Sequence, residues 1–178
     1  MKLTWFGGST FRIHIGGQII VTDADRAAAP VDVTELRSGA DREIALGDLG
    51  RLPAIDGTGW RPPRAVSPLE VDDAPRDMTI GQLEGHVLLV HAAGDPPLLL
   101  AGGAITGAGR WSRDAVVVGY GAAVRTPEVA VGLLEVLGPK LLLLAAPAPE
   151  LDVLFPVLRE HLSGTALVAL EAGMALEA

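Results

Sequence analysis

The chain contains no cysteine, so its fold cannot depend on disulfides and its chemistry cannot use a thiolate. Aromatic residues are scarce, at 4% of 178 residues, and Tyr120 is the only tyrosine. Basic residues are outnumbered by acidic ones, and the formal net charge of −8 disfavours binding to nucleic-acid phosphates. These absences exclude a disulfide-stabilised or thiol-dependent protein and argue against a nucleic-acid partner.

Long apolar runs are also missing. No run reaches the roughly 18 residues that a membrane-spanning helix needs. The most apolar stretch, 132–149, is interrupted by charged residues and by Gly138-Pro139. Lys2 leads directly into a strand pattern, without the apolar segment of a secretory signal. We therefore expect a cytoplasmic protein with no membrane partner.

What the chain does contain is a large share of small apolar residues. Hydrophobic residues make up 49% of the sequence, and the mean hydropathy is +0.36. A chain of this length can bury a sizeable core, so we expect one domain spanning residues 1–178. The high apolar content also fits a chain that buries an oligomer face, and we expect a homodimer.

The first 25 residues have the clearest strand pattern. Residues 2–6 and 10–15 each predict a strand, the second with alternating apolar and polar positions. Gly16-Gly17 permits the positive backbone angles of a tight hairpin turn. The run at 18–22 predicts a third strand, apolar enough to be covered on both faces.

The rest of the chain alternates strands and helices. Brief strands are expected at 31–33 and 65–71, with a further short element at 44–49. Stronger strand patterns cover 78–80, 86–91, 98–101, 115–119, 141–145 and 165–170.

Two helices are expected in the second half. Thr126 and Pro127 suit the start of a helix that ends at Gly138. A second helix is expected at 153–162, where Pro156 is tolerable only near the first turn. Residues 171–178 are expected to form a turn and a tail.

This order, strands first and then alternating strands and helices, predicts an α+β fold. It suits a four-layer αββα sandwich, in which two sheets pack together and helices cover their outer faces. An ordinary α/β or α+β domain would give a similar pattern, and periodicity alone does not separate these alternatives.

The opening segment LTWFGGSTFRIHIGGQIIVTD resembles the first hairpin of metallo-β-lactamase-fold hydrolases, particularly the L-ascorbate-6-phosphate lactonase-like branch. The resemblance implies an αββα sandwich that is reduced in size. In that family the fold supports hydrolysis at a pair of metal ions.

The resemblance also implies where the metal ligands would lie. The family's His-x-His-x-Asp-His loop aligns best with residues 37–42, where only Asp41 matches. Arg37, Gly39 and Arg42 take the histidine positions. The other expected ligand motifs read Gly7-Gly8-Ser9-Thr10, Gly102-Gly103-Ala104 and Leu144-Ala145-Ala146, which lack the expected histidines and aspartate. The implied member is therefore degenerate.

The chemical consequence is that a metal site is not expected. Zinc and similar ions need about four donor groups around one point, and glycine and alanine side chains supply none. Arginine is a permanent cation that cannot coordinate a metal. The remaining carboxylates, Asp23 and Asp41, are expected to pair with Arg37 and Arg42. We expect no metal, no cofactor and no assigned catalytic residue.

Few other residues suggest chemistry. The four histidines, His14, His86, His91 and His161, show neither His-x-His nor HExxH spacing. The glycine-rich segment 102–107 lacks a following Gly-Lys-Ser/Thr, so a turn between strands is the favoured interpretation over a phosphate loop. Tyr120 follows a buried strand and is expected near the pocket rim, packed or hydrogen-bonded to a ligand.

Three functional hypotheses follow. The favoured one is a metal-free, non-catalytic binding or interaction module. The second is a divergent hydrolase of small esters, lactones or phosphoesters that uses Asp23, Asp41 and Tyr120. The third is a sensor in which Arg37 and Arg42 hold a small anionic ligand.

Overall fold

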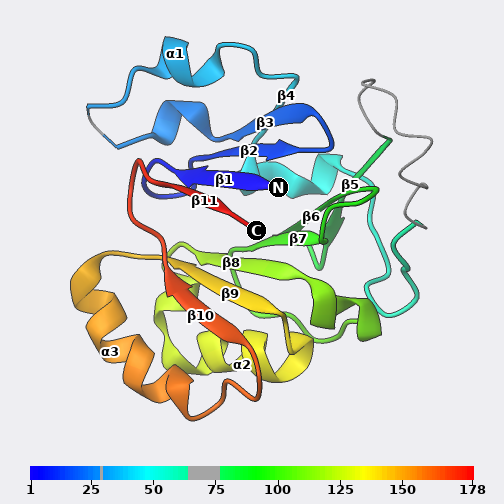
Figure 1. Ribbon diagram of the computed structural model, residues 1–178, viewed down its shortest axis with the longest axis vertical. Helices are drawn as coiled ribbons and strands as arrows, with labels where there is room; N and C mark the ends of the chain where they lie inside the picture. Colours follow the sequence, from blue (N-terminus) through cyan, green and yellow to red (C-terminus); the bar gives the residue numbers. More distant parts are fainter. Residues whose placement is uncertain (29, 64–76) are drawn as a thin grey trace.

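Two β-sheets pack face to face, and helices lie outside both of them (Figure 1). The computed structural model describes residues 1–28, 30–63 and 77–178. The α+β, αββα architecture expected from the sequence is confirmed. The expected strand at 65–71 lies outside the described residues.

The first sheet has five strands in the order β11-β1-β2-β3-β4. Their bounds are Lys2–Trp5 (β1), Phe11–Ile15 (β2), Gln18–Thr22 (β3), Arg42–Ile44 (β4) and Ala175–Glu177 (β11). Strands β3 and β4 are parallel and the other pairs are antiparallel. The turn between β2 and β3 has φ of 58° at Gly16 and 79° at Gly17, the conformation that a two-residue hairpin requires.

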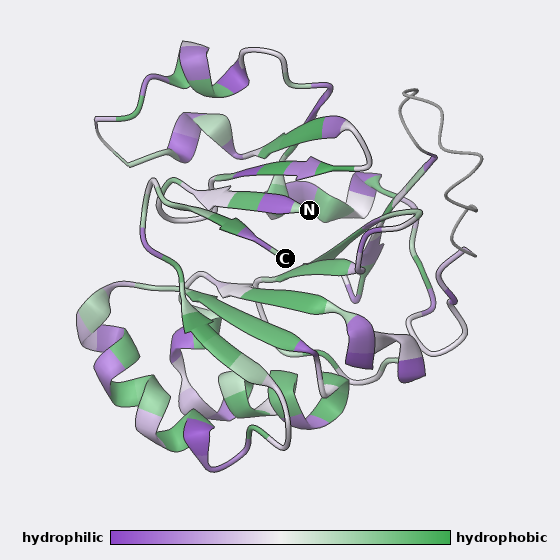
Figure 2. Cartoon of the chain, in the orientation of Figure 1, coloured by the Kyte–Doolittle hydropathy of each residue, from purple (hydrophilic) through white to green (hydrophobic). Residues whose placement is uncertain are grey.

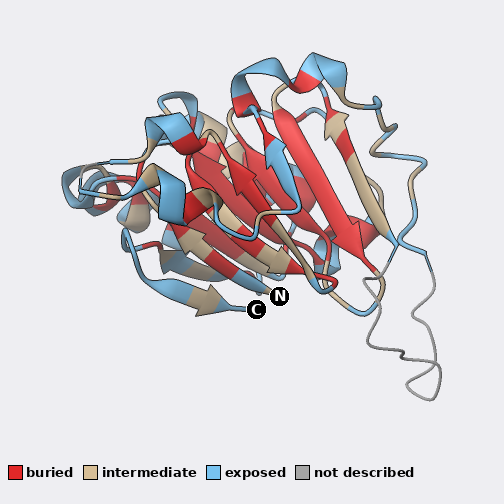
Figure 3. Cartoon of the chain, turned by 90° about the horizontal axis from the view of Figure 1, so that it is seen from above, coloured by how far each residue is buried: buried red, intermediate tan, exposed pale blue. Residues whose placement is uncertain are grey.

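The second sheet has six strands in the order β10-β9-β8-β7-β6-β5. Their bounds are Met78–Leu83 (β5), Val87–Ala92 (β6), Leu98–Ala101 (β7), Val116–Tyr120 (β8), Leu141–Ala145 (β9) and Ala166–Ala169 (β10). Strands β7 to β10 are parallel. The central strands are apolar and buried along their length, as parallel strands covered on both faces must be (Figures 2 and 3).

Helices α2 (Pro127–Leu137) and α3 (Ala148–Arg159) cover the outer face of the six-stranded sheet. The start and end predicted for α2 are confirmed, and Gly138 ends it with φ of 51°. Helix α3 begins five residues earlier than expected, because Pro149 fits its first turn. Pro156 therefore lies inside the helix, not near its start.

Two other sequence expectations were wrong. No strand forms at 31–33. Instead, Asp32 is the N-cap of helix α1 (Val33–Arg37), because its side chain accepts hydrogen bonds from the backbone N–H groups of Thr34 and Glu35. The expected tail forms β11, which pairs with β1 and completes the first sheet.

The remaining short elements are 3₁₀-helices. They are η1 (Ala24–Arg26), η2 (Leu46–Arg51), η4 (Arg110–Asp114) and η5 (Ala123–Arg125). The short element expected at 44–49 therefore divides between the end of β4 and the start of η2.

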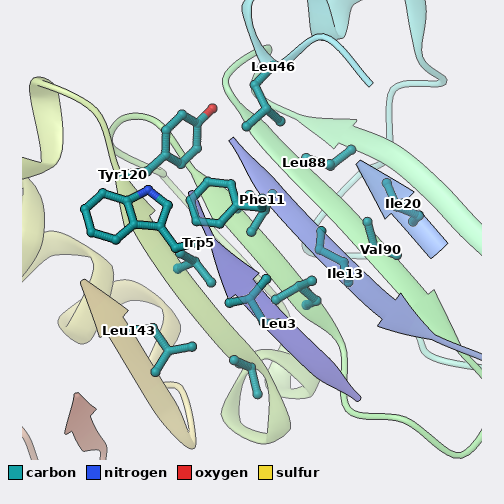
Figure 4. Close-up of a cluster of buried hydrophobic side chains, with 14 of the residues drawn as sticks. Leu3, Trp5, Phe11, Ile13, Ile20, Leu46, Leu88, Val90, Tyr120 and Leu143 are labelled. Atoms are coloured by element: carbon teal, nitrogen blue, oxygen red, sulfur yellow. The ribbon is translucent and has the colours of Figure 1, made fainter. Parts of the chain in front are cut away.

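The main core lies between the two sheets (Figure 4). Phe11 and Ile13 of the first sheet pack there with Leu88, Val90 and Leu143 of the second. A second core fills the space between the six-stranded sheet and helices α2 and α3. The third core lies on the outer face of the five-stranded sheet, and its buried members among the described residues are Val21, Ala24 and Leu36.

An aromatic cluster holds the segment before residue 63 against the second sheet. The ring of Trp60 packs edge-on against Trp111, with centroids 4.7 Å apart, and against His91, at 5.6 Å. The Trp111 indole N–H donates to the carbonyl of Gly57 at 2.7 Å. His91 is only 4% exposed, and its burial lowers the pKa of the imidazole, an effect that Asp95 offsets in part.

This burial predicts acid sensitivity. Below the unfolded-state pKa of about 6.5, the unfolded chain gains a proton at His91 that the folded chain resists. The contribution of His91 to the free energy of unfolding should be constant above about pH 7 and should fall towards pH 5. Urea denaturation at a series of pH values measures it. A His91→Phe variant keeps an aromatic ring beside Trp60 and should lose part of this slope. Equal slopes for the two proteins would contradict the prediction.

Candidate functional site

Several strand ends and the loops that follow them meet at one edge of the sandwich. Asp23 follows β3, Gly102 and Gly103 follow β7, and Tyr120 ends β8. In sheets with parallel strands, the carboxyl ends are the usual location of ligand sites. We call the group Ser9, Asp23, Gly102, Gly103 and Tyr120 the strand-end site.

At this edge, the Asp23 side chain links the first hairpin to the segment that follows β4. One carboxylate oxygen accepts a hydrogen bond from the Ser9 hydroxyl at 2.5 Å, and the other accepts from the backbone N–H of Leu46 at 3.2 Å. Its carbonyl accepts from the Thr10 hydroxyl at 2.8 Å. Asp23 has φ of 41°, an uncommon conformation for a residue other than glycine. Such strain persists where the surrounding contacts over-determine it, and it is frequent at functional sites.

Tyr120 is 8% exposed and packs edge-on against Phe11, with ring centroids 5.8 Å apart. Its hydroxyl points away from Phe11 (Figure 4) and forms no hydrogen bond with any described residue. A Cβ atom at Gly102 would lie 2.8 Å from this hydroxyl, so only glycine fits there. Burial, together with the charge of Asp23, raises the pKa of Tyr120 to about 12. The site therefore offers a neutral phenol as a hydrogen-bond donor.

The loop after β7 is held closely by the turn between β5 and β6. The His86 ring bonds the carbonyl of Ala104, and a Cβ atom at Gly103 would lie 2.9 Å from that ring. The Glu84 carboxylate accepts from the Thr106 backbone N–H at 2.9 Å and from its hydroxyl at 2.7 Å. Partial burial opposes ionisation of Glu84, but these hydrogen bonds lower its pKa overall. The loop leads to β8 through η4, without an α-helix at its end.

The structure does not bring the five residues suggested by the sequence into one pocket. Arg37 pairs with Asp25 at 2.8 Å and with Glu43 at 3.1 Å, not with Asp23 or Asp41. Arg42 is exposed, and its side chain has no hydrogen-bond or ion-pair partner among the described residues.

Asp41 lies away from the strand-end site. Its carboxylate accepts from the Ile19 backbone N–H at 2.7 Å. Ile19 is four residues before Asp23 along β3, which corresponds to about 13 Å. Only Asp23 and Tyr120 come together, and the expected pairing of Asp23 and Asp41 with Arg37 and Arg42 is wrong.

The register expected for the His-x-His-x-Asp-His loop, residues 37–42, stays a prediction, and the strand order offers an alternative to it. Residues 37–42 precede β4, whereas the family's loop follows a strand. The segment that follows β4 allows a different register, 44–49, in which Asp48 matches the aspartate. Ile44, Leu46 and Leu49 then take the three histidine positions, and all three are buried in the core between the sheets. This register could have been found from the sequence, because Asp48 follows a short strand pattern by a few residues.

The donor groups present do not fit a metal ion. Across residues 1–28, 30–63 and 77–178, no three His, Cys, Asp or Glu side chains are grouped so that they could hold one. Both carboxylate oxygens of Asp23 are already hydrogen-bonded, and Asp48 forms an ion pair with Arg51 at 2.6 Å. The space that a metal-bridging side chain at position 103 would need is taken by His86. Within the described part of the chain, the strand-end site therefore lacks the donor set of a metal centre.

Comparison with known proteins gives matches among solved structures only. No family model and no curated protein matches the sequence. The isothiocyanate hydrolase from Delia radicum gut bacteria is similar with a TM-score of 0.55 at 12% identity, covering 99% of both chains.

Two further structures have lower TM-scores. A candidate Zn-dependent hydrolase of the metallo-β-lactamase superfamily from Thermotoga maritima gives 0.49 at 15% identity, covering 97% of this chain and 100% of that one. A metallo hydrolase from Ignicoccus hospitalis gives 0.48 at 14% identity, covering 99% and 98%.

These similarities concern the fold. The chain has a metallo-β-lactamase-like fold, as the resemblance of its first hairpin predicted. At 12% identity, the isothiocyanate hydrolase says nothing about the reaction or ligand of this chain. The narrower resemblance to the lactonase-like branch stays a prediction.

The effect of the Asp23 charge on Tyr120 can be tested by titrating the phenol, because the chain has a single tyrosine. Tyrosinate absorbance in the wild type should appear near pH 12. In Asp23→Asn the pKa should fall but stay above the ordinary value of about 10, because burial persists.

Asp41→Asn is the matched control and should leave the titration unchanged. Tryptophan fluorescence should be followed in parallel to separate ionisation from alkaline unfolding. An identical titration of the Asp23→Asn variant and the wild type would contradict the electrostatic effect assigned to Asp23.

Proposed function

We propose that this protein is a metal-independent, non-hydrolytic binding module built on a hydrolase fold. The observation that carries the proposal is the apolar segment after β4. Leu46 and Leu49 are 6% and 1% exposed, and both belong to the core between the sheets. A segment that packs its side chains into the core cannot present them to a metal ion at the rim.

The surroundings of this segment support the same interpretation. The hydrogen bond from the Leu46 N–H to Asp23 fixes the start of η2 at the strand-end site. His86 occupies the space beside Gly103. Leu46, Leu49 and Gly103, three positions where the resemblance implies metal ligands, thus have other structural roles here.

The group we propose to meet the ligand is the Tyr120 hydroxyl. It is the end of a side chain that is more than nine-tenths buried, and it has no partner among the described residues. Since burial keeps the phenol protonated, it would donate a hydrogen bond to a carbonyl, ether or similar acceptor. The glycine at position 102 makes room for the hydroxyl itself, because a Cβ atom there would lie 2.8 Å from it.

Elemental analysis of purified protein tests the absence of a metal. After dialysis, zinc, iron and manganese should each be far below one equivalent, and added Zn²⁺ or Mn²⁺ should not raise the melting temperature. Near-stoichiometric metal that survives dialysis would overturn the proposal. The result does not depend on finding the ligand.

A second candidate, a divergent hydrolase of small esters, lactones or phosphoesters, is favoured by one observation. The Ser9 hydroxyl donates to Asp23 over only 2.5 Å, and Asp23 has strained backbone geometry. A carboxylate can act as a general base for a hydroxyl within hydrogen-bond reach. Asp41 is too far from this pair to take part. Of the three residues expected for a hydrolase, Asp23, Asp41 and Tyr120, it is therefore removed.

A substrate panel separates the two candidates. Under the first proposal, esters, lactones and phosphoesters should be hydrolysed no faster by the protein than by buffer. Under the second, Ser9→Ala and Asp23→Asn should each lower the activity by at least about 100-fold, as expected for loss of acid–base catalysis. Asp41→Asn is the control that should keep full activity.

We also propose that the protein is a cytoplasmic homodimer. Within the described residues, no helix is long and apolar enough to cross a bilayer. The homodimer expected from the apolar content can be checked by light scattering after size-exclusion chromatography. Arg37 is already paired with two carboxylates, so it offers no free guanidinium for the anionic ligand expected between Arg37 and Arg42.

A further inference from the structure

Strand β10 is an edge of the six-stranded sheet, and β11 is an edge of the five-stranded sheet. The two edges lie side by side on one flank of the sandwich, because residues of both strands line the same groove of ≈ 210 Å³. Its apolar lining includes Val168, Leu170, Met174 and Leu176. Val168 is 36% exposed and Met174 is 60% exposed, so this flank leaves large apolar side chains in water.

The other two sheet edges are protected against a further strand. Beside β5, the Gln82 N–H donates to the carbonyl of Pro53 at 2.9 Å, and the Ile55 N–H donates to the carbonyl of Gln82 at 3.0 Å. Strand β4 carries the exposed charges of Arg42 and Glu43. Covering segments and charges of this kind prevent edge-to-edge pairing in natural proteins. Strand β10 has neither, since residues 164–170 carry no charge and no described segment pairs with its outer side.

The outer side of β10 presents backbone groups without partners. The Ala166 N–H donates to the carbonyl of Lys140, on the β9 side, at 3.1 Å. Because backbone groups alternate in direction along a strand, the N–H and C=O groups of Leu167 and Ala169 point away from β9. None of these four groups has a hydrogen-bond partner among the described residues.

These backbone groups are complementary to themselves under a two-fold axis. Two copies of β10 can run antiparallel with Leu167 of each copy opposite Ala169 of the other, and all four groups on each strand then pair. This register places Val168 opposite its own counterpart, at the kind of position where side chains of antiparallel strands approach most closely. The large exposed side chain of the strand is therefore at the centre of the pairing.

The charges near the ends of β10 complement each other in the same register. Glu171 of one copy would lie beside Thr165 of the other. Lys140 is the neighbour of Thr165 within the sheet, because the residues that follow them, Leu141 and Ala166, are paired. Glu171 and Lys140 are both exposed, and neither has an ion-pair partner among the described residues. The two-fold axis brings this acidic residue and this basic residue together twice.

We propose that β10 is the interface of a homodimer, in which the six-stranded sheets of two copies join into one continuous sheet across Val168. The occupant of the edge is a second copy, because the same strand satisfies both the outward backbone groups and the charges at the strand ends. The pairing also covers apolar surface beside the groove. This interface rests on the homodimer proposed above and is independent of the strand-end site.

The register can be tested by cross-linking, because the chain has no cysteine and one introduced thiol is unique. In Val168→Cys the two thiols would face each other, with Cα atoms about 4.5 Å apart, within the range of a disulfide. Mild oxidation of the full chain should give a disulfide-linked dimer on non-reducing gels. Ala166→Cys is the matched control on the same face of the same strand. Its thiol would be displaced from its counterpart by four residues, about 13 Å, so it should not cross-link.

Light scattering after size-exclusion chromatography measures the association itself. The wild type should be a dimer. Val168→Lys should raise the dissociation constant at least about tenfold, because each copy loses a buried valine and gains a charge that faces its own counterpart. Val136→Lys is the control, since Val136 lies on α2, is similarly exposed at 38%, and should stay dimeric. Circular dichroism should show the same fold for all variants.

The end charges can be tested by a charge swap. Glu171→Lys should raise the dissociation constant by about twofold to fivefold, the scale of exposed charge contacts. Adding Lys140→Glu to that variant should restore the wild-type value. Failure of the second substitution to restore it would contradict the register.

Three other results would overturn this interface. A wild-type monomer would remove the homodimer as well. A dimer that persists in the folded Val168→Lys variant would mean that the copies associate through another face. Equal cross-linking of Val168→Cys and Ala166→Cys would mean that β10 does not pair in this register. None of these results bears on metal content or hydrolysis, so a failure here is distinct from a failure at the strand-end site.

Discussion

The hydrogen bonds of the Asp23 carboxylate link the first hairpin to the segment after β4. One oxygen holds the Ser9 hydroxyl and the other holds the Leu46 N–H. With its N–H held, Leu46 turns its side chain into the core between the sheets. Both carboxylate oxygens accept hydrogen bonds that hold the fold together. This carboxylate therefore differs from one that is free to bind a metal ion. The absence of a fitting donor set at the strand-end site follows from how this residue is used.

The loops at the same edge show a related constraint. Glycines at 102 and 103 let the Tyr120 hydroxyl and the His86 ring rest against the backbone. Any side chain at either position would displace one of these groups. The edge of the sandwich is therefore filled by packing and hydrogen bonds, and one buried phenol is left with an open donor. This arrangement is the basis of the binding function proposed above.

The two outer faces of the sandwich differ in how completely they are covered. Helices α2 and α3 bury the face of the six-stranded sheet. On the other side, Asp32 starts a helix of five residues, and Arg12 fastens its end. A helix this short cannot cover a sheet face, so a cleft remains.

The sequence by itself determined the first hairpin, the main apolar strands and helix α2, because these depend on periodicity, on the Gly16-Gly17 turn and on local helix signals. The αββα class was predicted only through the resemblance of the opening segment to a known fold, since periodicity alone left an ordinary α/β or α+β domain open. It also indicated Asp23 and Tyr120. Only the tertiary structure decided that Arg37 pairs with Asp25, because that contact joins segments apart in the chain. The tertiary structure also decided that the segment after β4 packs into the core. A short apolar run has the same sequence pattern in a loop and in a core, and only its neighbours in space distinguish the two.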